Sequence, residues 1–186
     1  MRSHAAEYLS MLEPAAPCFH VPRMFMDGFA LSSFEALIDY KALSSLFPPV
    51  REFENRETYL AFERNAMGLI DELRRPKGEV SHSLFMAAML WPVVEERARE
   101  AGFENALQMT LDEEDRAYHF KARERGHVEA TLHLEAALTS QARTGDGAPA
   151  AETLEGITAS PYFGDAMLIL RARAITDTDA ARTLEF

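Results

Sequence analysis

The sequence predicts an all-α fold, and three observations support this prediction. Apolar residues recur at spacings of three and four along nearly the whole chain. Strand-like alternation of apolar and polar residues does not persist for more than a few positions. The chain has 186 residues, of which 47% are hydrophobic, and this is enough to build one core of ordinary size. We therefore expect a domain of several packed helices.

The first helices are predicted in an apolar stretch at residues 21–48. Ser32 and Glu35 have the spacing of a capping box, in which two side chains satisfy free backbone N–H groups at a helix start. The helix that begins there is expected to continue to about Phe47. Pro48 ends it, because proline cannot donate a backbone hydrogen bond.

Two strongly apolar helices are predicted next. The first carries an apolar stripe over residues 59–73 and ends near Arg75. The second begins after Ser81, is apolar over more than half of its circumference, and ends at Gly102. We expect this second helix to be central and buried. Pro92 lies inside it, and the missing N–H group predicts a kink.

The acidic run 112–115 is expected to open the next helix, where negative charge suits the positive end of the helix dipole. Four clustered carboxylates could also bind a divalent cation, but adjacent helical residues point to different faces, which favours capping and solubility. Gly126 is expected to precede a further helix at 127–142. His127 and His133 are six residues apart and do not have the spacing of a zinc pair. No metal or other cofactor is expected.

The chain is predicted to have one helical domain in two connected parts. Residues 1–143 form the main helical domain, and residues 144–151 form a flexible linker with two Gly, one Pro and several small residues. Residues 152–186 form a C-terminal helical element that packs on the same domain. Within it, Ser160 followed by Pro161 is typical of a helix start.

The formal net charge of -11 argues against a general binder of polyanions, since such binding depends on Lys and Arg neutralising phosphates. The sequence has no apolar run long enough to span a membrane and no secretory signal pattern. We expect a cytoplasmic protein that does not bind membranes. Cys18 is the single cysteine, so it cannot form an internal disulfide and is expected to be buried or merely tolerated.

The sequence lacks common catalytic motifs. It contains no Gly-x-Ser-x-Gly segment around a nucleophilic serine and no glycine-rich phosphate loop. The helix at 84–91 is similar to the helix that carries paired His-Asp ligands in metal-dependent phosphohydrolases, but Trp91 and Pro92 stand where those ligands would be. We therefore expect no enzyme activity from this chain alone. A degenerate hydrolase is the alternative, and it predicts a bound metal.

Three apolar segments occur in a particular order. The first runs from Val-Pro-Arg-Met-Phe-Met-Asp-Gly-Phe at 21–29 to Ser-Leu-Phe-Pro at 45–48. The second is Leu-Phe-Met-Ala-Ala-Met-Leu-Trp-Pro at 84–92, and the third is Ser-Pro-Tyr-Phe-Gly-Asp-Ala-Met-Leu-Ile-Leu-Arg-Ala-Arg at 160–173. In order and spacing, these segments resemble the C-terminal helical region of bacterial poly(A) polymerases, in the class II tRNA nucleotidyltransferase and poly(A) polymerase family. The resemblance covers about residues 3–175.

The resemblance implies a multi-helix orthogonal bundle that forms the neck and body of such an enzyme, whose helices hold RNA toward a catalytic head. The head of the family carries a Gly-Ser dipeptide and an Asp-x-Asp pair that holds two magnesium ions. This chain has no Gly-Ser dipeptide, and its Asp177 and Asp179 are expected to form a polar helix end near the C-terminus. The implied function is a non-catalytic RNA-binding-type domain, which holds RNA for 3′-end nucleotide addition by a head that is absent here.

The resemblance also implies where RNA phosphates would bind. The predicted contacts are Arg23, Lys41, Arg74, Arg75, Lys77, Arg171 and Arg173. Family members carry an arginine-rich stretch before the third segment, and the linker replaces it here, so RNA binding is expected to be weak. The alternative is an acidic helical protein–protein interaction module on the same scaffold, with a separate nucleotidyltransferase head as one possible partner.

Overall fold

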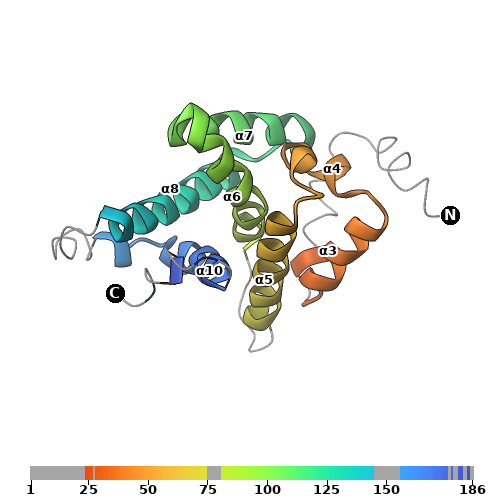
Figure 1. The fold of residues 1–186 in the computed structure, drawn as a ribbon, viewed down its shortest axis with the longest axis horizontal. Coiled ribbons are helices and arrows are strands. Elements are labelled where there is room, and N and C mark those ends of the chain that lie inside the picture. Colours follow the sequence, from red (N-terminus) through yellow and green to blue (C-terminus); the bar gives the residue numbers. More distant parts are fainter. Residues whose placement is uncertain are drawn as a thin grey trace.

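The computed structural model describes residues 24–26, 28–74, 81–144, 156–175, 177, 180–181 and 184, with side chains at 74 and 140–144 left undescribed. Every regular element in this part of the chain is helical, which confirms the all-α prediction. None of its helices is both long and apolar enough to cross a bilayer. The main elements (Figure 1) are α3 (Ala30–Asp39), α4 (Leu43–Leu46), the 3₁₀ helix η2 (Pro48–Glu52), α5 (Glu57–Arg74), α6 (His82–Ala101), α7 (Phe103–Tyr118), α8 (Ala122–Thr144) and α10 (Phe163–Ala174).

Helix α6 lies at the centre of the fold, as the sequence predicts (Figure 1). It packs against α5, α7, α8, α10 and η2, and every residue from Ser83 to Trp91 is buried. The hydroxyl of Ser81 accepts a hydrogen bond of 2.9 Å from the Leu84 N–H group, so Ser81 is the N-cap of this helix. The helix continues past Pro92 and ends where Gly102 adopts a φ of 79°.

Three phenylalanines join the N-terminal segment to the central helix. Phe25 stacks on Phe85 with ring centroids 4.1 Å apart. Phe47 meets Phe85 edge-on at 5.7 Å and Phe25 at 6.5 Å. All three rings are fully buried, so they anchor the first apolar segment in the same core as α6.

The capping-box prediction at Ser32 is wrong, because the start of α3 is capped from another helix. The helix begins at Ala30, and the carboxylate of Asp71 in α5 accepts hydrogen bonds from the N–H groups of Ala30 at 2.7 Å and Leu31 at 3.2 Å. The Ser32 hydroxyl instead donates to the carbonyl oxygen of Phe29 at 3.1 Å. A carboxylate 41 residues away thus replaces the local cap.

The predicted helix from Ser32 to Phe47 is also divided. Lys41 has a φ of 52°, in the left-handed region, and it separates α3 from the short α4. Pro48 does follow the last helical residues, but it opens the 3₁₀ helix η2. This agrees with the tolerance of proline in the first turn of a helix, where its N–H group is not needed.

Two predicted boundaries on the next helices are wrong. Helix α7 begins at Phe103, so the acidic run 112–115 lies in its second half and does not open a helix. Helix α8 begins at Ala122 and passes through Gly126. One glycine inside a helix costs only about 1 kcal/mol relative to alanine, which does not offset the packing of a 23-residue helix against α6 and α10.

The C-terminal helix α10 packs against α5, α6 and α8. It begins at Phe163, with Tyr162 as its N-cap, two residues later than Ser160 and Pro161 predict. The Ser160 hydroxyl accepts a hydrogen bond of 3.3 Å from the Tyr162 N–H group in the turn before the helix. Residue 144 ends α8, and the rest of the predicted linker lies outside the described residues, as do Cys18 and Asp179.

Candidate functional site

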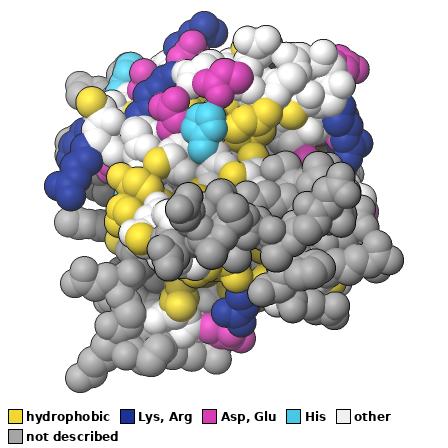
Figure 2. Space-filling model, turned by 90° about the vertical axis from the view of Figure 1, so that its left-hand side faces the viewer, with side chains coloured by type: hydrophobic (Ala, Val, Ile, Leu, Met, Phe, Trp, Pro, Cys, Tyr) yellow, Lys and Arg dark blue, Asp and Glu magenta, His cyan; other side chains and the backbone are white. Residues whose placement is uncertain are grey.

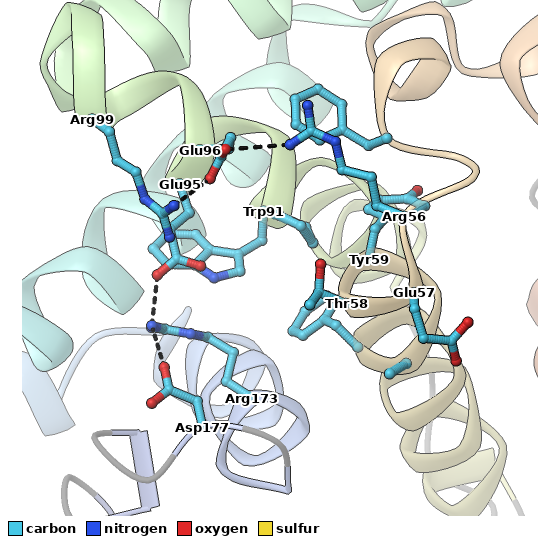
Figure 3. A pocket seen from close by; sticks show the side chains of 14 residues that line it. Arg56, Glu57, Thr58, Tyr59, Trp91, Glu95, Glu96, Arg99, Arg173 and Asp177 are labelled. Carbon is cyan, nitrogen blue, oxygen red and sulfur yellow. Dashed lines mark hydrogen bonds and ion pairs between the residues drawn. The ribbon is translucent and has the colours of Figure 1, made fainter.

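A pocket of about 520 Å³ opens between the start of α5, the second half of α6 and the end of α10 (Figure 3). Its buried aromatic residues are Phe53, Tyr59, Phe62 and Trp91. The lining carries three arginines and four carboxylates, so its formal charges nearly cancel. The arginines are Arg56, Arg99 and Arg173, and the carboxylates are those of Glu57, Glu95, Glu96 and Asp177.

Arg173 organises the floor of the pocket. Its guanidinium group donates to Glu135 Oε1 and Glu95 Oε1, each at 2.7 Å, and to Asp177 Oδ2 at 3.2 Å. It also donates to the Thr139 hydroxyl at 2.9 Å. Figure 3 shows it between Glu95 and Asp177. One buried cation therefore links α6, α8 and α10.

The same geometry corrects the prediction that Arg173 binds RNA. Its exposed fraction is 3%, and its guanidinium lies over the Trp91 ring, 5.3 Å from the centroid. A phosphate contact needs a cation that reaches the surface, whereas this one is committed to carboxylates and an aromatic face in the interior. Arg173 is therefore a structural residue.

The buried ion pair shifts the pKa values of both partners. Burial raises the pKa of Glu135 to about 7, because desolvating the carboxylate costs more than the attraction of Arg173 returns. Burial also disfavours the charged form of Arg173, but the nearby carboxylates, led by Glu135 and then Glu95, outweigh it and raise the pKa of the guanidinium. Arg173 thus remains charged, while Glu135 titrates near neutral pH.

Two further arginines stand at the mouth of the pocket and share one carboxylate. Arg56 Nη1 lies 3.3 Å from Glu96 Oε1, and Arg99 Nη1 lies 2.7 Å from Glu96 Oε2 (Figure 3). Their side chains are 49% and 70% exposed. Such exposed pairs add little stability, about 0 to 1 kcal/mol each. Both guanidinium groups therefore remain accessible to a ligand from solvent.

A second polar cluster joins the starts of α6 and α10 to α8. The Ser81 hydroxyl donates to Asp165 Oδ2 at 3.2 Å, and His127 Nε2 lies 2.9 Å from the same oxygen. These residue types occur in hydrolytic triads, where histidine must contact the serine to accept its proton. Here the carboxylate of Asp165 lies between the serine and the histidine. The arrangement therefore caps α6 and links it to α8 and α10, and it does not activate a nucleophile.

Next to it, His82 bridges α7 and α8. Its Nδ1 lies 2.9 Å from Glu124 Oε1, and its Nε2 lies 2.6 Å from the Tyr118 hydroxyl. Burial lowers the pKa of His82 even though Glu124 opposes this shift. We expect a neutral imidazole at pH 7 that holds the buried tyrosine in place.

The acidic run 112–115 does not converge on one point. Asp112 pairs with Arg125 at 2.6 Å, and Glu113 pairs with Arg97 at 2.8 Å. Asp115 accepts a hydrogen bond from the Phe120 N–H group at 2.7 Å. Glu114 is fully buried, and neither of its oxygens has a hydrogen-bond partner among the described residues. Burial, and then the neighbouring Glu113, raises the pKa of Glu114 well above its ordinary value.

The other predicted RNA contacts are not brought together in the described part of the chain. Lys41 and Arg171 are both exposed. Lys41 lies in the turn between α3 and α4, whereas Arg171 lies on α10, and α3 and α10 pack against α5 from different sides (Figure 1). Arg74 ends α5, but its side chain is not described. The other three, Arg23, Arg75 and Lys77, lie outside the described residues. Among the described residues on the face shown in Figure 2, basic side chains are scattered among acidic ones and form no continuous ridge.

The sequence interpretation missed Glu135 as a partner of Arg173, although a signal was present. Arg173 follows Leu170 at a spacing of three, which places it on the apolar face of α10, and Glu135 has the same relation to Leu132 on α8. Charged residues on apolar stripes are seldom buried alone. Two such residues of opposite sign predict an ion pair between helices.

No protein-family model matches this sequence, and no curated protein matches it. The resemblance to poly(A) polymerases therefore rests on the three sequence segments alone.

Proposed function

We propose that this chain is a non-catalytic RNA-binding-type domain of a poly(A) polymerase-like protein. In this role it holds RNA for 3′-end nucleotide addition by a catalytic head that this chain does not contain. The observation that carries the proposal is that all three resembling segments meet on the central helix α6.

The contacts between the segments are specific. Phe25 and Phe47 of the first segment pack on Phe85 of the second. Trp91 of the second segment receives the guanidinium of Arg173 from the third. The residues that carry the resemblance are thus mainly core residues, so they support a shared scaffold more directly than a shared ligand.

The RNA role depends on surface cations and is therefore expected to be weak. Lys41 and Arg171 are the predicted contacts whose side chains are described and exposed. With a net charge of -11, the protein as a whole repels phosphates, so binding should be detectable only at low salt.

Fluorescence anisotropy of labelled oligo(A) and of tRNA, titrated with the full chain at several salt concentrations, tests the proposal. Binding at about 50 mM salt that weakens as salt rises is expected. The double substitution Lys41→Glu and Arg171→Glu should lower the slope of log affinity against log salt by roughly 1.4, at about 0.7 for each phosphate contact on a single strand. Arg51→Glu, on an exposed residue of η2 outside the predicted set, is the matched control. Absence of binding at the lowest salt refutes the RNA role.

A second candidate is an acidic protein–protein interaction module, and the surface supports it directly. Phe29 is 65% exposed beside α3, and Tyr40 at its other end is 47% exposed, on a protein with strong negative charge. Light scattering and co-purification distinguish this function. A strictly monomeric protein that captures no partner and binds oligo(A) supports the RNA role instead.

A further inference from the structure

Three potential metal ligands meet on the surface between α7 and α8. Glu104 lies in the first turn of α7, and Glu129 and His133 lie one turn apart on the same face of α8. One ligand atom from each residue lies within 4.8 Å of the other two. His133 Nε2 lies 3.6 Å from Glu104 Oε2.

Other side chains contact Glu129 and His133, the two potential ligands on α8, and orient them. Gln108 Nε2 donates to Glu129 Oε1 at 2.8 Å, and Arg125 donates to Gln108 Oε1 at 3.1 Å. The Phe103 ring meets the His133 ring edge-on, with centroids 5.3 Å apart. Partners of this kind orient metal ligands and restrict their rotation. One oxygen of Glu129 remains outside the Gln108 hydrogen bond.

The cluster carries two carboxylates with which the nearby Arg125 forms no ion pair. Among the described residues, Glu104 and Glu129 form no ion pair with a lysine or arginine, and Arg125 is already paired with Asp112 at 2.6 Å. Carboxylates this close repel one another unless a cation lies between them. The electrostatics of the cluster thus favour a bound cation.

We propose that Glu104, Glu129 and His133 form a binding site for a divalent transition metal, with Zn²⁺ as the best fit, that ties α7 to α8. An imidazole with two carboxylates suits Zn²⁺ better than Mg²⁺ or Ca²⁺, which prefer oxygen ligands alone. Three protein ligands leave a position for water, and the exposed setting provides it. The site shares no residue with the pocket around Arg173, and it does not depend on RNA binding.

The ligands need only a small movement to close on a metal. Zinc–ligand distances of about 2.0 to 2.2 Å place tetrahedral ligands roughly 3.4 Å apart. The side chain of Glu104 is 65% exposed, so it can move by about 1 Å through rotation of its own bonds. The sequence interpretation considered His133 only with His127, and it missed this site because one ligand comes from another helix.

Isothermal titration of the chelator-treated full chain with ZnCl₂ tests the proposal. One Zn²⁺ per chain with micromolar affinity is expected, and MgCl₂ should bind much more weakly. His133→Ala should lower the zinc affinity by more than about 100-fold, and Gln108→Leu, which removes only the support of Glu129, by about tenfold. His119→Asn is the matched control, because His119 is exposed, lies outside the cluster, and has a φ of 56° that asparagine tolerates.

Cobalt provides an independent readout of the coordination. Co²⁺ should give visible absorption bands typical of a four- or five-coordinate site in the original chain, and these bands should vanish in His133→Ala. If that variant does not fold, as judged by circular dichroism, Glu104→Gln serves in its place, because the exposed Glu104 side chain contributes little packing. Absence of zinc binding, equal binding of Mg²⁺, or one-to-one zinc binding that survives the ligand substitutions overturns the proposal.

Discussion

Replacing Arg173 with methionine tests the buried ion pair most directly. Methionine retains much of the side-chain volume but removes the charge and every donor. Glu135 would then lose its partner while its side chain stays fully buried, whereas Glu95 and Asp177 are 32% and 37% exposed and can be hydrated. Most of the loss in the free energy of unfolding should therefore come from the unpaired carboxylate of Glu135.

The expected loss is about 3 to 5 kcal/mol in the free energy of unfolding, the usual cost of leaving one member of a buried pair without its partner. This is a large share of the 5 to 15 kcal/mol typical of a domain. The loss of stability should be larger at pH 8 than at pH 6. Because the pKa of Glu135 is about 7 beside Arg173, this carboxyl group is mostly protonated at pH 6, and removing Arg173 then leaves little buried charge without a partner.

Urea denaturation followed by circular dichroism measures the effect. Arg171→Met is the control, since Arg171 is exposed two residues earlier on the same helix and should change stability by less than about 0.5 kcal/mol. The double variant Arg173→Met with Glu135→Leu should recover most of the loss, because it leaves no buried charge. If Arg173→Met costs no more than the control, or if the second substitution rescues nothing, the buried carboxylate is not the cause and the reasoning fails.

Four further substitutions test the account of the helices. Gly126→Ala should stabilise the protein by about 0.5 to 1 kcal/mol in thermal or urea unfolding, since Gly126 lies inside α8 and an added Cβ would meet nothing within 4 Å. Gly102→Ala should destabilise it, because Gly102 has a φ of 79°, and equal effects at both positions would contradict this account. Asp71→Ala should cost about 1 kcal/mol by removing the cap of α3, with the exposed neighbour Glu72→Ala as a near-neutral control. For Glu114, burial raises the folded-state pKa above the ordinary 4.5, so the folded state binds more protons and stability falls as pH rises from about 4.5. Glu114→Met should therefore gain more stability at pH 8 than at pH 5, and a gain independent of pH would show that the pKa of Glu114 is not raised in the folded state.

The helices with strong local signals are those that the sequence predicts well. The apolar stripe of α5 and its end near Arg75 match the observed helix, which ends at Arg74. Ser81 and Gly102 bound α6 as predicted. In each case the periodicity and the terminal residue lie within a few positions of each other, so neighbouring residues alone define the helix.

The errors occur where residues distant in the sequence decide the outcome. Asp71 caps α3 from 41 residues away, so the local capping signal at Ser32 is not used. Gly126 remains helical because α8 packs along its length on α6 and α10. The predicted RNA contact Arg173 is buried because Glu135, 38 residues away, lies opposite it.

The sequence by itself determined that the chain is helical and which helix is central, since these properties follow from local periodicity and from the amount of apolar surface to be buried. The tertiary structure alone decided which charges lie inside, which helix starts are capped from a distance, and that Glu104 meets Glu129 and His133. The physical reason is that desolvation and ion pairing depend on which helices face each other, and a single sequence does not specify that arrangement.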